Sequence, residues 1–202
     1  MRTVVIFLVL IITVSCSQKK NQLPILGTPD IIGEDTIYPT VPNFEFTNQL
    51  SQPVTNQTFH DKIYVADFIF LTCPSICPKM TNELHKVYQN FENNEHVLFL
   101  SHTIDPKNDS VPLLYDHANL LKVNHKKWHF VTGKEYKIHD IAENGYYAAA
   151  YKDSLAPGGF AHSGGLLLID KYKHIRGVYD GTSDKETKKL IKDIALLIEE
   201  QF

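Results

Sequence analysis

The pattern of apolar and polar positions changes between two periods along the chain. Short runs of β-branched and aromatic residues predict buried strands at residues 63–71, 97–100, 128–131, 146–151, 166–169 and 175–179. Apolar residues at helical spacing predict helices at residues 78–91, 110–123, 134–143 and 184–202. Alternation at 44–46 and a run at 54–59 predict a hairpin that leads into the first main strand. Together these elements indicate an α/β domain with a central mixed β-sheet flanked by helices.

The first 37 residues do not follow this pattern. Met1-Arg2 precedes an apolar run at 3–14 that is too short to span a bilayer, which predicts a signal peptide over residues 1–15. The run ends at Thr13-Val14-Ser15-Cys16, which resembles a bacterial lipobox and predicts lipidation of Cys16; the alternative is an ordinary secretory signal with an incidental cysteine. Residues 16–37 then predict a flexible tether, and residues 38–202 the folded domain.

Composition and charge narrow the class of protein. The chain has 202 residues, of which 43% are hydrophobic and 21% charged, which is enough for one substantial core. Its net charge of -3 gives no broad basic surface of the kind that nucleic acid attracts. We therefore expect no nucleic-acid partner. A lipidated Cys16 would place the domain in the bacterial cell envelope, outside the cytoplasm, in an oxidising compartment.

Two cysteines carry the candidate chemistry. Cys73 and Cys77 follow directly after the strand predicted at 63–71, and each is followed by a proline. The helix begins at this motif, where Pro78 suits a first helical turn. The positive end of the helix dipole favours thiolate over thiol, and thiolate is both nucleophile and metal ligand. Cysteines at the end of the first main strand of an α/β domain are the arrangement of the thioredoxin fold.

The spacing of Cys73 and Cys77 leaves two functions open. With Cys16 lipidated, no other thiol remains, and a disulfide between cysteines this close closes too small a loop to stabilise much. A purely structural disulfide is therefore disfavoured. A redox-active dithiol usually has two intervening residues, whereas this motif has three. The wider spacing lets two thiolates approach one metal ion, and thiolates select Cu(I).

His162 favours the metal site over the dithiol. It lies in a glycine-rich loop at 157–165, just before a buried strand, where glycines allow close backbone approach. A neutral imidazole beside two thiolates suits copper in either oxidation state. Other candidates are weaker: we expect Met80 in the core, His102 at a strand end and His129 in a structural role. The sequence pattern alone does not bring His162 near the cysteines.

A resemblance to the Sco/SenC family supplies that step. It rests on segments that match in order and spacing from about residue 42 to the C-terminus: Thr72-Cys73-Pro74-Ser75-Ile76-Cys77-Pro78, Asp105-Pro106, Trp128-His129-Phe130-Val131-Thr132-Gly133, His162-Ser163 and Leu168-Ile169-Asp170. The resemblance implies a thioredoxin-like fold and one copper ion per chain, as Cu(I) or Cu(II). It further implies that Cys73, Cys77 and His162 are the copper ligands, and that Asp105 lies beside them at most.

The resemblance also implies a function. The family assists assembly of the dinuclear copper centre of cytochrome c oxidase, as a metallochaperone, a thiol reductase or both. The implied partners are the copper-bearing oxidase subunit, a thiol-disulfide reductant and, through the lipid anchor at Cys16, a membrane. The alternative is a membrane-tethered thiol-disulfide reductase with Cys73 and Cys77 as its catalytic dithiol, which has no need of His162. A peroxidase is disfavoured because the mature chain has one arginine, Arg176, far from the motif in sequence.

Overall fold

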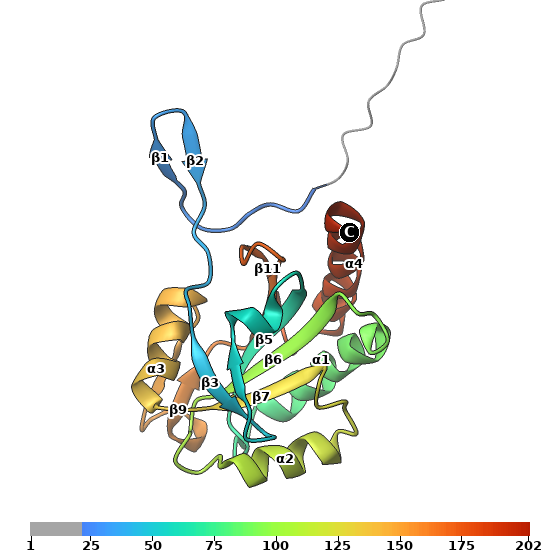
Figure 1. Cartoon of the computed structure of the whole chain (residues 1–202). Helices are drawn as coiled ribbons and strands as arrows, with labels where there is room; N and C mark the ends of the chain where they lie inside the picture. The colour runs from blue at the N-terminus through green and yellow to red at the C-terminus, as the bar shows by residue number, and fades with distance from the viewer. Residues whose placement is uncertain (1–21) are drawn as a thin grey trace, which may run out of the picture.

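A seven-stranded mixed sheet forms the centre of the computed structural model, which describes residues 22–202 (Figure 1). The strand order is β11-β10-β5-β6-β7-β3-β4. The parallel central strands are β5 (Ile63–Ile69), β6 (Val97–Thr103) and β7 (Trp128–Thr132). Antiparallel strands flank them on both sides: β3 (Glu45–Asn48), β4 (Pro53–Thr55), β10 (Gly165–Ile169) and β11 (Ile175–Asp180). The predicted mixed sheet with a leading hairpin is confirmed.

Helices connect and cover these strands. They are α1 (Cys77–Phe91), α2 (Val111–Leu120), α3 (Glu135–Asp140) and α4 (Asp184–Gln201), with 3₁₀ turns η1 (Asn56–Phe59) and η3 (Pro157–Gly159) and a π-helical turn η2 (Ile141–Gly145). α1 and α4 pack against each other, and the Thr187 hydroxyl on α4 donates a hydrogen bond of 2.8 Å to Glu83 on α1. Their apolar faces point into the core, as the helical spacing predicts.

Strand β5 lies at the centre of the core, with all seven residues buried. One of these buried residues is Asp67, whose carboxyl group accepts a 2.5 Å hydrogen bond from the Ser101 hydroxyl on β6. The Ser101 oxygen in turn accepts from the Trp128 indole N–H on β7, at 2.8 Å. This polar chain crosses the three parallel strands, and the Cys73–Cys77 motif begins just beyond the carboxyl end of β5.

The structure corrects the predicted boundaries at three places. Strand β6 continues through Thr103, predicted as loop, because it pairs with β5 as far as Ile69. Residues 146–149, predicted as strand, are not strand, since the Tyr146 and Ala148 amides close the turn of η2. The strand there is β8 (Ala150–Lys152), which pairs with β9 (Phe160–His162). Residues 56–59, also predicted as strand, form the 3₁₀ turn η1, whose first amides the Thr55 hydroxyl caps.

Part of the segment predicted as a tether, residues 22–37, has secondary structure. β1 (Asp30–Ile32) and β2 (Asp35–Ile37) form a small hairpin that stands away from the sheet (Figure 1). Before it, the Leu26 amide donates to the Ile175 carbonyl at 2.8 Å, so this part of the predicted tether is attached to the domain. The predicted signal peptide and Cys16 lie outside the described residues. Within residues 22–202, no helix has the length and apolar character needed to cross a membrane.

Candidate metal centre

The two cysteines sit where the chain turns from β5 into α1. The Cys73 amide donates to the Phe70 carbonyl at 3.2 Å, which closes a tight turn after the strand. Cys77 is the first residue of α1, and Pro78 occupies its first turn, as the sequence predicts. Both side chains are buried, with exposed fractions of 7% and 5%, and both are free thiols. The free N–H groups of the first turn of α1 therefore lie at the motif.

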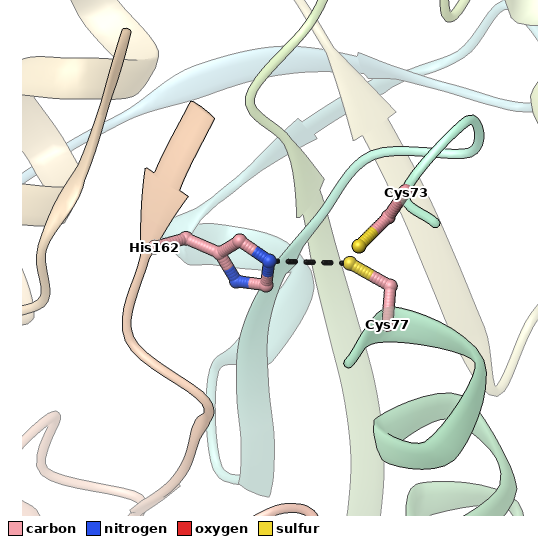
Figure 2. Close-up of side chains that lie close together, drawn as sticks. All are labelled: Cys73, Cys77 and His162. Carbon is pink, nitrogen blue, oxygen red and sulfur yellow. Dashed lines mark hydrogen bonds between the residues drawn. The ribbon is translucent and has the colours of Figure 1, made fainter. Parts of the chain in front are cut away.

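His162 completes a cluster with the two thiols. It lies at the end of β9, and its ring points from the β8–β9 hairpin toward Cys77 (Figure 2). The His162 Nε2 atom is 3.3 Å from the Cys77 Sγ atom. The ligand atoms of Cys73, Cys77 and His162 all lie within 4.8 Å of one another. The structure therefore brings together residues that are 85 positions apart in the sequence.

The three groups differ in their protonation. Burial raises the pKa of Cys73, but hydrogen bonds from the Ser75 and Cys77 amides and from the Cys77 thiol outweigh it, so this pKa falls below its ordinary value. Burial raises the pKa of Cys77 well above its ordinary value, and the charges of Cys73 and Asp67 add to that effect. Burial lowers the pKa of His162, which keeps its imidazole neutral at pH 7. In the metal-free site Cys73 is thus the more acidic of the two thiols, and His162 offers a neutral imidazole.

The other predicted candidates lie outside this cluster. Met80 is fully buried in the core, as predicted. His102 is also fully buried, on β6, with aromatic rings around it from Phe44, Phe46, Phe68 and Tyr146. His129 lies 3.3 Å from the Asn48 side-chain amide, which agrees with the predicted structural role. The Arg176 guanidinium binds Asp170, Glu200 and the carbonyls of Leu23 and Pro24.

An aspartate that sequence reasoning missed supports the motif. Asp109 is buried, and its Oδ2 atom accepts from the Leu71 amide at 3.1 Å and from the Thr103 hydroxyl. It thereby joins the chain just after β5 to the end of β6. Asp105, the predicted neighbour of the ligands, accepts instead from the Asn108 side-chain amide at 2.7 Å. The sequence feature that could have indicated Asp109 is its place in the loop at the carboxyl end of a buried strand.

Fold and site together define a class of protein. The chain is a thioredoxin-like α/β domain with two cysteines and a histidine gathered at the carboxyl end of its central strand. The model of the SCO1/SenC family matches residues 34–199, and the chain belongs to this family. The match covers the sheet, the motif and the hairpin that carries His162.

Individual relatives agree with this assignment. The chain is 25% identical to the SCO1 protein homolog of Bacillus subtilis over 163 residues, which cover 80% of this chain and 84% of that protein. A SCO1/SenC family lipoprotein of Bacillus anthracis has a structure that matches with a TM-score of 0.72 at 25% identity, over 79% of this chain and 95% of that one.

Two further solved structures are similar. One is BsSco, a member of the Sco family of cytochrome c oxidase assembly proteins in which a disulfide switch was identified; its TM-score is 0.68 at 25% identity, over 77% of this chain and 91% of that one. The other is the copper-bound ScoI of Arabidopsis thaliana, with a TM-score of 0.65 at 21% identity, over 78% of this chain and 99% of that one. At 21% identity, the likeness to the Arabidopsis protein shows a shared fold only.

Proposed function

We propose that this chain is an envelope copper metallochaperone that assists assembly of the dinuclear copper centre of cytochrome c oxidase. Its copper-binding site would consist of Cys73, Cys77 and His162, with one copper ion per chain. The observation that carries the proposal is the convergence of these three ligand atoms within 4.8 Å in a member of the SCO1/SenC family. The donor set of two thiols and an imidazole supports copper as the cargo, and the oxidase-assembly family of BsSco supports the recipient.

The chemistry of the donors fits copper as cargo. Two thiolates select Cu(I), and an imidazole adds the nitrogen donor that Cu(II) requires. The lowered pKa of Cys73 makes it the easier thiol to deprotonate, and Cys77 must release its proton when the metal binds. His162 is neutral, so its Nε2 lone pair is available without loss of a proton. The copper-bearing subunit of the oxidase is the proposed recipient.

A thiol-disulfide reductase is the second candidate, and the unequal thiols favour it. In this function the Cys73 thiolate attacks a disulfide of the recipient and forms a mixed disulfide, releasing one recipient thiol. The Cys77 sulfur then attacks Cys73, its proton passes to the departing recipient sulfur, and the second recipient thiol is released with a Cys73–Cys77 disulfide left behind. A thiol reductant in the envelope must return this disulfide to the dithiol. None of these steps requires an imidazole ligand.

Copper titration of the mature chain separates the two functions. Under anaerobic conditions, with a chromophoric Cu(I) competitor, the reduced protein should bind one copper ion and the disulfide form none, because oxidation removes both thiolates. Equal binding by both forms would contradict the proposed site. The variant His162→Ala should lose Cu(II) affinity by at least roughly 10–100-fold while its rate of disulfide reduction stays unchanged.

A matched variant controls for the loss of a histidine. His60 is exposed at the end of η1, so His60→Ala should bind copper as wild type does. In cells, His162→Ala should impair oxidase assembly to the same degree as Cys73→Ser. If His162→Ala supports assembly without copper affinity, the reductase is the better description.

The proposed location is the bacterial cell envelope, with a lipid anchor on Cys16. The lipobox-like segment at 13–16 supports it, as does the family lipoprotein of Bacillus anthracis. Mass spectrometry of the membrane fraction should find a chain that starts at Cys16 and carries added acyl mass. A soluble chain with another, unmodified N-terminus would refute the anchor.

A further inference from the structure

The hairpin that carries His162 is separate from the central sheet. Within the described residues, β8 and β9 hydrogen-bond as strands only to each other. Just after the hairpin, the Gly181 amide donates to the Gly164 carbonyl at 2.7 Å. The tip of the hairpin is open to solvent, where Leu155 is 94% exposed. The position of His162 relative to the cysteines therefore depends on how the side chains of the hairpin rest on the domain.

The hairpin rests on Phe70. The ring of Phe160 lies 5.2 Å from the Phe70 ring, and the ring of His162 meets it edge-on at 5.7 Å and 82°. Phe160 and His162 are two residues apart on β9, so they share one side of the strand. Phe70 is buried, and its carbonyl accepts the hydrogen bond from the Cys73 amide. Phe70 thus contacts both the histidine and the turn that holds the first cysteine.

Gly158 makes the closest approach to this ring. A Cβ atom at Gly158 would lie 2.7 Å from Cε2 of Phe70 and 3.1 Å from Cδ of Pro74. A Cβ atom on the neighbouring Gly159 would have no such atom within 4 Å. Both glycines have positive φ angles, +79° and +82°, which L side chains rarely adopt. The two residues therefore share a backbone requirement and differ in their contact with the motif.

We propose that Gly158 is a positioning residue for His162. Its missing side chain seats the β8–β9 hairpin against Phe70 and Pro74, at the depth that brings His162 Nε2 to 3.3 Å from Cys77 Sγ. A methyl group at 158 must displace either Phe70 or the hairpin. Phe70 is held in the core, whereas the hairpin pairs with itself alone, so the hairpin moves and carries His162 with it. The consequence for copper rests on the proposed function; the seating itself concerns the metal-free protein.

The metal-free protein tests the seating directly. In the reduced mature chain, NMR should show a nuclear Overhauser effect between the His162 ring and the Cys77 β-protons. The effect should persist in Gly159→Ala and disappear in Gly158→Ala. Adding Phe70→Leu to Gly158→Ala removes the ring atoms that clash and should restore it. Persistence of the effect in Gly158→Ala, or its loss in Gly159→Ala as well, would overturn the proposal.

Copper binding provides the second readout. Cu(II) affinity should fall roughly 10-fold or more in Gly158→Ala, toward that of His162→Ala, and stay within about twofold in Gly159→Ala. Cu(I) affinity should change less, because two thiolates alone can hold Cu(I). The rate at which Cys73 and Cys77 reduce a generic disulfide should be equal in wild type, Gly158→Ala and Gly159→Ala. If wild type binds no copper, the proposed function fails, whereas the proton contact still decides the role of Gly158.

Discussion

Asp67 should make the stability of this protein fall between about pH 4 and pH 7. Its carboxyl group is 1% exposed in the middle of β5, and the hydrogen bond from Ser101 is its one polar contact of normal geometry among the described side chains. Burial raises its pKa from 3.8 to about 7, and the Ser101 hydrogen bond offsets only part of that increase. Between these two values the unfolded chain has released the proton and the folded protein still holds it. Unfolding then releases a proton, so the free energy of unfolding decreases as pH rises through this window.

The magnitude follows from the same two pKa values. Relative to low pH, the shifted pKa of Asp67 lowers the free energy of unfolding by about 4 kcal/mol above pH 7. At pH 5 the loss is about 1.5 kcal/mol. The variant Asp67→Asn keeps an acceptor for Ser101 and removes the charge. Its added amide N–H₂ introduces a pH-independent cost of about 1–3 kcal/mol where it finds no acceptor. The free energy of unfolding of the variant minus that of wild type should therefore be about 2–3 kcal/mol larger at pH 8 than at pH 5. The pH-independent cost cancels in this comparison.

Urea unfolding of the reduced, metal-free protein at pH 5 and pH 8 measures this difference. Asp116→Asn is the matched control, because Asp116 is exposed and its removal should leave the pH dependence of wild type unchanged. Equal stability changes for Asp67→Asn at the two pH values would refute the reasoning. They would show that Asp67 is ionised in the folded protein at pH 5 as well, and that water or another donor solvates it.

Three shorter predictions address other parts of the fold. Neither ring nitrogen of His102 has a hydrogen-bond partner of normal geometry, and burial lowers its pKa to about 3, so His102→Phe should raise stability by about 1–2 kcal/mol, measured by thermal unfolding. Arg176→Met leaves the buried Asp170 without its guanidinium partner and should cost about 3–5 kcal/mol. The same variant frees the carbonyls of residues 23–24, so limited proteolysis should cut near them faster than in wild type. Asp109→Ala should lower stability by about 1–3 kcal/mol in urea unfolding, because the Leu71 amide and the buried Thr103 hydroxyl lose their acceptor, whereas Asp105→Ala should cost less.

Periodicity predicted the elements that bury a continuous face. Strand β5 and helix α1 follow from an apolar run and from apolar residues at helical spacing, since burial on one side imposes those patterns. The same reasoning failed at residues 146–149, which are apolar but alternate between buried and exposed positions around a π-helical turn. It also ended β6 too early, because Ser101, His102 and Thr103 are polar residues that the fold buries inside a strand.

The site residues also divide into those that the sequence pattern predicted and those that it did not. Cys73, Cys77 and the start of α1 are local in sequence, so their spacing predicted their geometry. His162 reaches them only after the β8–β9 hairpin has packed against Phe70 beside the motif, and the resemblance to a known family was needed to place it. Asp109 went unnoticed, and Gly158 was noted only as one glycine of the loop at 157–165. Their contacts, with Leu71 and with Phe70, exist only after β5, β6 and the hairpin have assembled. No periodicity in the sequence encodes them.

The division between local and distant ligands has a consequence for the proposed function. The two thiols belong to a hydrogen-bonded turn and the helix start between β5 and α1, whereas the imidazole belongs to a hairpin that, among the described strands, pairs with itself alone. Two thiolates suffice for Cu(I), and Cu(II) requires the nitrogen donor as well. A displacement of the hairpin therefore lowers affinity for Cu(II) more than for Cu(I). In the proposed copper site, the contact between Gly158 and Phe70 would therefore govern affinity for Cu(II), while the cysteines would govern whether copper binds at all.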